Sequence, residues 1–326
     1  MLAVEISSFG SPEVLKAVER PKPVPKDDEV VIRVEAAGVA RADTLQRQGK
    51  YPPPPGAPDI PGLDVAGTID SIGANVSHLQ PGDPVCAILT GGGYAEYCVA
   101  PAVQALPVPA GWTTIEAGTL PENIFTVYDN LITRAGLTRG EIVLIHGGSS
   151  GIGSMAIMLS RAWGAIPIVT AGTASKCEAC LRLGAEQAIN YRENDFVVEA
   201  KRITDGRGVD VVLDMVGGPY LARNLECLAS EGRISIVSTQ GGRTGELDLG
   251  QLMRKRARVL ASMMRARTAE QKGAVAQGLL RDVWPLLPRK NPIRPVIDAV
   301  FPLADARLAH QRMEGGEHIG KILLVT

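Results

Sequence analysis

The fold of this chain is decided by the stretch Glu141-Ile142-Val143-Leu144-Ile145-His146-Gly147-Gly148-Ser149-Ser150-Gly151-Ile152-Gly153. Its four consecutive aliphatic residues, 142–145, predict a strand that is buried on both faces. A glycine-rich turn follows, and an apolar helix continues from Ser154. A strand, a glycine turn and a helix in this order present backbone N–H groups and the positive end of a helix dipole to an anion, usually a phosphate. We therefore expect a dinucleotide-binding turn, although its spacing, Gly148-x-x-Gly151-x-Gly153, differs from the usual GxGxxG.

The same turn allows two other interpretations. Gly147-x-Ser149-x-Gly151 fits the nucleophile elbow of α/β-hydrolases, and Asp214 and His310 follow in the chain order of a catalytic triad. This hydrolase interpretation stays open. The turn is also similar to that of short-chain dehydrogenases, which need a Tyr-x-x-x-Lys pair. No lysine stands four residues after any of the six tyrosines, so that interpretation is excluded.

Composition limits the class of protein. A length of 326 residues predicts two domains. A formal charge of -1 argues against a general nucleic-acid or membrane-surface role. We expect no signal peptide, because Met1 to Glu5 reach an acid before an apolar segment forms, and no apolar run is long enough to cross a membrane. Five scattered cysteines predict reduced thiols and a cytoplasmic location.

The pattern of elements changes near residue 115. Before it, the chain is expected to be β-rich, with strands at 29–37, 65–73, 84–88 and 94–99 and a polyproline loop at 51–55. After a helix at 115–134, strands are expected at 142–146, 166–170, 188–191, 209–215, 233–238 and 258–263, with helices from 154 and at 174–183, 194–204 and 220–228. This alternation predicts an α/β fold with a Rossmann-type, doubly wound parallel sheet. A long helix after 268, a strand at 296–301, a helix at 304–313 and a strand at 321–325 complete the chain.

The nucleotide can be predicted from the end of the second strand of this sheet. In dinucleotide folds an acidic residue about 20 positions past the glycines usually binds the adenosine ribose 2′-OH. Here no acid occurs between Gly153 and Glu178, and the strand ends in Gly172, Thr173 and, after two residues, Lys176. Small hydroxyls, free N–H groups and a lysine favour a 2′-phosphate. Thr173 can also serve as a helix cap. We therefore predict NADPH rather than NADH.

A set of motifs extends over the whole chain, and it comprises Arg47-Gln48-Gly49-Lys50-Tyr51, Ile60 to Gly67, Phe125-Thr126-Val127-Tyr128, the glycine turn, Gly172 to Lys176, Ile189-Asn190-Tyr191, Asp214 to Gly218 and Ile319-Gly320-Lys321-Ile322. With these motifs the chain resembles the quinone oxidoreductase branch of the zinc-independent medium-chain dehydrogenase/reductase superfamily. The resemblance implies a GroES-like, β-rich catalytic domain at 1–118, a Rossmann dinucleotide-binding domain at 119–264, and a C-terminal segment, 265–326, that returns to the catalytic domain.

The resemblance also implies site residues. The cofactor-binding residues it implies, together with those of the glycine turn, are Ser150, Gly151, Ile152, Gly153, Gly172, Thr173, Lys176, Tyr191, Met215, Thr239, Gln240, Met264 and Arg265. Lys176 and Tyr191 are expected near the 2′-phosphate. Tyr51 and Thr126 are the expected catalytic residues, because their positions in the family imply that they orient the substrate carbonyl. The alternative for Tyr51 is that its ring packs on the proline tract. Many family members have Asn where this chain has Ala40.

Metal ligands are missing from the expected places. Zinc-dependent relatives carry Cys and Gly-His-Glu where this chain reads Ala40-Arg41-Ala42-Asp43 and Gly62-Leu63-Asp64. Structural zinc needs four close cysteines, and only Cys86 and Cys98 lie nearby. Cys177-x-x-Cys180 falls within a predicted helix and is expected to pack there. We predict no metal.

The function expected from these observations is transfer of hydride from NADPH to quinones or related electron-poor carbonyls and alkenes. An enoyl-thioester or enone reductase is the alternative within enzymes. An NADPH-binding sensor or nucleic-acid-binding protein with little turnover is the alternative of another class. The basic run 254–258 is better explained as a solvated helix end than as a nucleic-acid site. The strand 258–263 is expected to be an edge that pairs in a homodimer.

Overall fold

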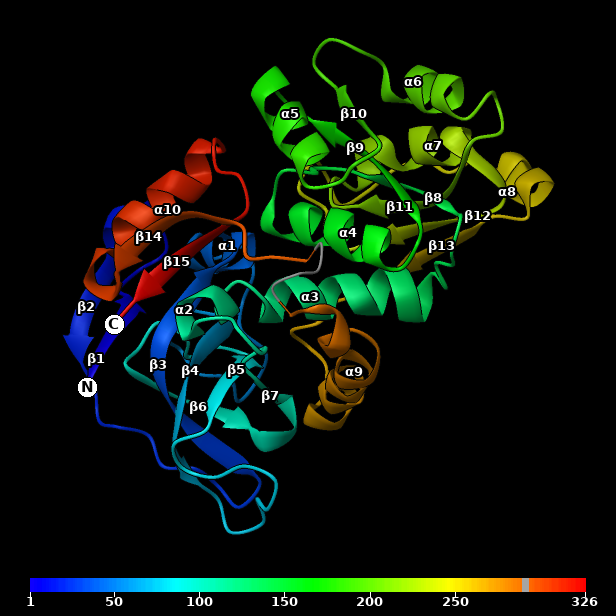
Figure 1. Cartoon of the computed structure of the whole chain (residues 1–326). Helices are drawn as coiled ribbons and strands as arrows, with labels where there is room; N and C mark the ends of the chain where they lie inside the picture. Colours follow the sequence, from blue (N-terminus) through cyan, green and yellow to red (C-terminus); the bar gives the residue numbers. More distant parts are fainter. Residues whose placement is uncertain (289–292) are drawn as a thin grey trace. The chain divides into compact units, whose positions relative to one another are not determined.

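The computed structural model describes residues 1–288 and 293–326. The chain divides into two compact units, which are described separately (Figure 1). The first unit takes Met1–Phe125 and most of the chain after Met264, and the second takes Thr126–Met263. The domain limits given above, 1–118, 119–264 and 265–326, remain predictions. No helix in the described ranges is long and apolar enough to span a membrane.

The second unit is built on a six-stranded sheet that is parallel throughout. Its strands lie in the order β10-β9-β8-β11-β12-β13. Their bounds are β8 (Ile142–Ile145), β9 (Ile166–Ala171), β10 (Gln187–Asn190), β11 (Val209–Asp214), β12 (Leu228–Ile236) and β13 (Arg258–Ala261). In chain order this is 3-2-1-4-5-6, the arrangement of a dinucleotide-binding Rossmann fold. The predicted fold class is confirmed. From β8 to β10 the chain adds strands toward one edge of the sheet, and from β11 on it adds them toward the other edge, so the strand order reverses between β8 and β11.

Helices on both faces cover this sheet (Figure 1). They are α4 (Gly151–Ala162), α5 (Ala174–Arg182), α6 (Phe196–Ile203), α7 (Gly218–Cys227) and α8 (Leu249–Lys255). Four of them begin where a side-chain oxygen accepts a hydrogen bond from a first-turn N–H group, and these caps are Ser150, Thr173, Asp195 and Asp248. Aliphatic residues such as Leu144, Ile168 and Val212 are completely buried between sheet and helices.

The helix predicted at 115–134 is three segments rather than one. They are α2 (Thr114–Ala117), α3 (Pro121–Val127) and a π-helical turn, η3 (Tyr128–Arg134). Proline at the start of α3 ends the preceding segment, because proline has no N–H group to donate. The edge strand β13 is also shorter than predicted, with four residues instead of the six at 258–263.

The first unit contains a seven-stranded sheet and a separate hairpin of β1 (Leu2–Ile6) and β2 (Leu15–Glu19). The sheet order is β14-β15-β3-β4-β5-β7, with β6 paired to β3. The bounds are β3 (Glu29–Val39), β4 (Asp64–Ile72), β5 (Pro84–Ile88), β6 (Tyr97–Pro101), β7 (Ala105–Pro107), β14 (Ile297–Pro302) and β15 (Lys321–Val325). The C-terminal β15 runs antiparallel to β3, so the end of the chain completes the sheet of its beginning. This is the GroES-like domain that the family resemblance implied.

The helices of the first unit include α2 and three longer ones. These are α1 (Arg41–Arg47), α9 (Ala269–Asp282) and α10 (Ala306–Gly315). Helix α10 packs on β14 and β15, and α9 packs beside the short turn 102–104. The core between these elements consists mostly of small and aliphatic side chains, with Tyr94 as a large exception.

Candidate functional site

The glycine turn joins β8 to α4 and leaves two backbone donors open. The Ser150 hydroxyl accepts a hydrogen bond from the Gly153 N–H group at 3.0 Å. The first-turn N–H groups of Gly151 and Ile152 have no acceptor among the described residues. Such orphan donors lie at the positive end of the helix dipole. The turn can therefore bind an anion such as a diphosphate.

The turn requires glycine at specific positions. A Cβ on Gly153 would lie 2.2 Å from the carbonyl oxygen of Gly147, so the helix could not approach the turn as it does. Gly147 itself has a positive φ of 65°, and a Cβ there would lie 2.6 Å from the Met215 sulfur. Met215 directly follows β11, so the glycine turn and Met215 meet where the two halves of the sheet join. Ligands of doubly wound sheets bind at this point.

A second group of predicted residues gathers at the ends of β9 and β10. A Cβ on Gly172 would lie 2.8 Å from the hydroxyl of Tyr191, so the tyrosine lies directly over this glycine. Thr173 caps α5 by accepting from the Lys176 N–H group at 3.3 Å, and its hydroxyl lies 3.1 Å from that of Ser175. Hydroxyls and a lysine therefore surround the end of β9, without an acid in the stretch 172–176.

Thr239 and Gln240 lie on a loop that docks against the end of β11. The Gln240 N–H group donates to the carbonyl of Met215 at 3.3 Å. A Cβ on Gly217 would lie 2.9 Å from the Thr239 Cα, so the loop packs closely on this glycine. Both Thr239 and Gln240 are exposed. In the second unit the predicted cofactor residues thus follow the carboxyl ends of neighbouring strands.

Sequence reasoning missed a buried polar network beneath the glycine turn. The Nδ1 atom of His146 lies 3.0 Å from the Thr170 hydroxyl, and its Nε2 atom lies 2.8 Å from the Asn224 side-chain oxygen. Asn224 donates in turn to the Asp214 carboxylate at 3.0 Å. Because Asn224 accepts through its oxygen, the Nε2 atom of His146 carries a proton. Burial lowers the pKa of His146 to about 4, which keeps it neutral. No spacing in the sequence signals this network, because its members come from four different elements.

The same contacts remove the hydrolase interpretation. Asp214 accepts from Asn224 and from the N–H groups that follow β11. His310 is bound to Arg47 at 3.2 Å and to the Tyr94 hydroxyl at 3.0 Å. Both expected triad partners of Ser149 are therefore occupied elsewhere, and the triad interpretation is wrong.

Tyr51 and Arg265 lie together in the first unit. The guanidinium of Arg265 lies 5.3 Å from the centre of the Tyr51 ring, within cation–π distance. Tyr51 is half-buried, and burial raises the pKa of its phenol. Met264 precedes Arg265 and is half-buried. Thr126 lies on α3 in the second unit, where its carbonyl accepts from the Asn130 amide at 2.9 Å.

An ion-pair network occupies the region where zinc-dependent relatives carry ligands. The ammonium of Lys321 lies 2.9 Å from the Asp64 carboxylate and 3.4 Å from that of Glu122. A Cβ on Gly38 would lie 2.4 Å from Asp64 Oδ1, so glycine makes room for this pair. Burial raises the pKa of the neighbouring Asp43 to about 7. Among the described residues, no group of three or more His, Cys, Asp or Glu side chains is arranged to hold a metal ion.

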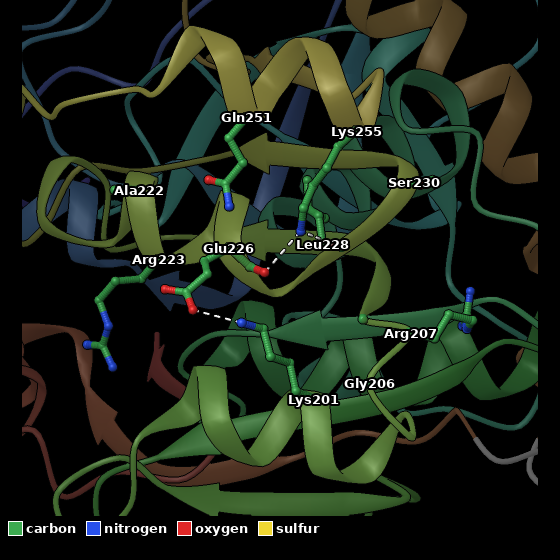
Figure 2. Close-up of a pocket in the computed structure, with 11 residues that line it drawn as sticks. Lys201, Gly206, Arg207, Ala222, Arg223, Glu226, Leu228, Ser230, Gln251 and Lys255 are labelled. Atoms are coloured by element: carbon green, nitrogen blue, oxygen red, sulfur yellow. Dashed lines mark hydrogen bonds and ion pairs between the residues drawn. The ribbon is translucent and has the colours of Figure 1, made fainter.

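A separate pocket of about 640 Å³ lies at the amino ends of β11 and β12 (Figure 2). Four cations line it, but each already holds an acceptor. Lys201 pairs with Glu226 at 2.7 Å, and Lys255 donates to the carbonyls of Glu226 and Leu228. Arg207 and Arg223 pair with Asp210 and Asp195. The charges that line this pocket are therefore already paired or hydrogen-bonded within the protein.

Comparison with known proteins agrees with this geometry. Residues 26–110 match the alcohol dehydrogenase GroES-like domain, and residues 151–278 match the zinc-binding dehydrogenase family. The chain is 33% identical to human quinone oxidoreductase over 100% of its own length and 98% of that protein. The structure of Escherichia coli quinone oxidoreductase complexed with NADPH matches with a TM-score of 0.86 and 30% identity, covering 100% of both chains. The apo form of JamJ enoyl reductase matches with a TM-score of 0.88 and 26% identity, covering 99% of this chain and 98% of that one.

The chain belongs to the medium-chain dehydrogenase/reductase superfamily, and within it to the quinone oxidoreductases. The family match over residues 151–278 carries a zinc-binding name, yet the positions where zinc ligands are expected hold Ala40, Leu63 and the Asp64–Lys321 pair.

Proposed function

We propose that this protein is an NADPH-dependent reductase that transfers hydride, without a metal, to quinones or related electron-poor carbonyl and alkene substrates. The observation that carries the proposal is the acid-free end of β9, where Gly172 lies beneath the Tyr191 hydroxyl and Lys176 lies in the first turn of the next helix. The similarity to quinone oxidoreductases over the full chain supports it.

The residues present fit this cofactor. Gly151 and Ile152 offer two N–H groups to its diphosphate, and Thr173, Lys176 and Tyr191 offer hydroxyls and a positive charge to its 2′-phosphate. The residues proposed to line the rest of its path are Ser150, Gly153, Met215, Thr239, Gln240, Met264 and Arg265. When bound, NADPH supplies the hydride.

The substrate needs orientation more than acid catalysis. A reduced quinone can take its proton from water. The protein therefore needs only a positioned hydrogen-bond donor that orients the substrate oxygen. We propose Tyr51 and Thr126 as those donors. Tyr51 is held in place by Arg265 over its ring, which lowers the entropy lost when it engages a substrate oxygen. Ala40 brings no amide to the site, so fewer other donors are present.

Reduction of enoyl thioesters or enones is the second candidate function. The match to JamJ enoyl reductase over nearly the whole chain supports it. Steady-state rates with 1,2-naphthoquinone, a simple enone and an enoyl-CoA compare the two directly. Tight NADPH binding with no turnover of any acceptor would instead favour a sensor or nucleic-acid-binding protein.

We also propose a homodimer and a cytoplasmic location. Strand β13 is an edge of the six-stranded sheet, and its Val259 is partly exposed, so a second copy could extend the sheet across a two-fold axis. Sedimentation that found only monomer at micromolar concentration would contradict the dimer. The five cysteines are free and buried, which supports a reducing compartment.

A further inference from the structure

Two buried cations lie side by side in the first unit. Arg265 donates from Nε to the carbonyl of Thr90 at 2.8 Å, and Lys272 donates to the hydroxyl of the same threonine at 2.9 Å. Arg265 is 5% exposed and Lys272 is 1% exposed. A second guanidinium nitrogen of Arg265, Nη2, donates to the Gln46 side-chain oxygen at 2.7 Å. The two cations thus share Thr90, and the hydrogen-bond partners of both are neutral.

Neither charge is neutralised within the described part of the chain. Among residues 1–288 and 293–326, no carboxylate lies within ion-pair distance of Arg265 or Lys272, and the nearby Asp43 affects Arg265 by its charge without a direct contact. The Nη1 atom of Arg265 is buried and has no hydrogen-bond partner in the part of the chain that the structure describes. Buried charges are normally paired, and a buried donor without a partner is unfavourable, so a bound anion would stabilise this pair of residues.

The position of Lys272 strengthens this conclusion. It lies in the first turn of α9, where the helix dipole disfavours a cation. The next residue, Gly273, lets the helix approach Val103, since a Cβ there would lie 3.2 Å from that side chain. Close packing therefore holds Lys272 beside Arg265 although dipole and charge both oppose it.

We propose that Arg265 and Lys272 form an anion subsite that holds a carboxylate or sulfonate group of the acceptor substrate. Arg265 also lies over the ring of Tyr51, the residue proposed to orient the reacting carbonyl. Tyr51 and Thr90 are the members of this cluster that retain solvent exposure, so an acceptor would enter past them. The substrate class then narrows to quinones or enones that carry an acidic group. This inference rests on the proposed reductase function.

The charge state of Lys272 agrees with the proposal. Burial, followed by the nearby Arg265 and Arg267, lowers the pKa of Lys272 to about 8. A bound anion would supply the opposite charge that the cluster lacks and would favour the protonated lysine. Above this pKa the free protein should lose affinity for an acidic acceptor.

The test compares two acceptors that differ only in charge, namely a 1,4-naphthoquinone with a propionate side chain and its methyl ester. In the wild-type protein, kcat/KM should be about 10-fold higher for the acid, the effect of a charge-assisted hydrogen bond. The ratio of acid to ester should fall about 10-fold in Lys272→Met and recover in Lys272→Arg. The KM for NADPH should stay within about 2-fold in Lys272→Met, because Lys272 is not among the residues proposed to line the cofactor's path.

Two outcomes would overturn the subsite. One is equal use of acid and ester by the wild-type protein. The other is an equal loss for both acceptors, or a raised KM for NADPH, in Lys272→Met, which would assign the cluster to packing or to the cofactor. If Lys272→Met does not fold, the wild-type pH profile decides, because the acid-to-ester ratio should fall above a pH of about 8. If neither acceptor turns over, the reductase function fails, and calorimetric titration with the acid and the ester then tests the subsite alone.

Discussion

Lys176 lies in the first turn of α5, four residues after Gly172, and we propose that it binds the 2′-phosphate together with Tyr191. Replacing it with alanine, Lys176→Ala, should weaken NADPH binding by about 1.5–3 kcal/mol, the size of a lost charge-assisted hydrogen bond. NADH lacks the phosphate, so its affinity should hardly change. Dissociation constants for both cofactors, measured by fluorescence titration, check this. Equal losses for the two would mean that Lys176 has a structural role.

Tyr51 combines a packed ring with a phenol that has no hydrogen-bond partner among the described residues. Tyr51→Phe keeps the ring beneath Arg265 and removes only the donor. If the phenol orients the substrate carbonyl, kcat/KM should fall about 10-fold, as expected for a lost neutral hydrogen bond of ~1.4 kcal/mol. Steady-state kinetics of Tyr51→Phe and Tyr51→Ala separate donation by the phenol from packing by the ring. A silent Tyr51→Phe with a harmful Tyr51→Ala would remove Tyr51 from the catalytic residues.

At the scale of elements, the contact between the glycine turn and α4 determines both stability and cofactor binding. Gly153→Ala places a Cβ 2.2 Å from the Gly147 carbonyl oxygen, so the helix must move away from the turn. We expect a stability loss of about 1–3 kcal/mol, as for overpacking, together with loss of NADPH binding. Gly315→Ala is the control, because nothing lies within 4 Å of a Cβ there. Thermal unfolding measures the loss of stability, and cofactor titration measures the loss of NADPH binding. A Gly153→Ala protein that binds NADPH normally would contradict the role proposed for this turn.

The network of His146 links β8 to β9, β11 and α7, and it should make stability depend on pH. The pKa of His146 is lowered from 6.5 to about 4, so the unfolded chain binds more protons between these values. Stability from His146 is therefore full above pH 6.5 and is lost as the pH falls toward 4. His146→Gln should reduce the slope of unfolding free energy in this window by about 1.4 kcal/mol per pH unit. Urea unfolding at several pH values measures the slope, and identical slopes in both proteins would contradict the buried neutral histidine.

The elements around the glycine turn could be predicted because each carries a local signal. Aliphatic runs mark the parallel strands, and Thr173 or Asp195 marks a helix start. Helix α1 was not predicted, since it is seven residues long and lacks a clear apolar face. The helix end expected at the basic run 254–258 agrees with α8, which ends at Lys255. The π-helical turn could not be predicted either. Within it, the side-chain oxygen of Asn130 accepts from Ser235 and Ser262, which lie far along the chain.

At the scale of the whole molecule, the residues proposed to bind the nucleotide carry a local sequence signal, whereas the buried polar networks carry none. Ser150 to Gly153 form one contiguous stretch and Gly172 to Lys176 form another, so each motif can be recognised in the sequence alone. Arg265 and Lys272 are seven residues apart and meet only because both contact Thr90. Such a cluster becomes visible only when the fold brings distant segments together.

The activity that both units of the molecule are proposed to serve is the reduction of a quinone by NADPH. The most direct measurement is the rate at which NADPH absorbance disappears when 1,2-naphthoquinone is added to the purified protein, compared with NADH at equal concentration. We predict turnover with NADPH, a clear preference for NADPH over NADH in kcat/KM, and no loss of activity after treatment with a chelator. Failure of the protein to oxidise NADPH with this quinone, or equal rates with the two cofactors, would contradict the account.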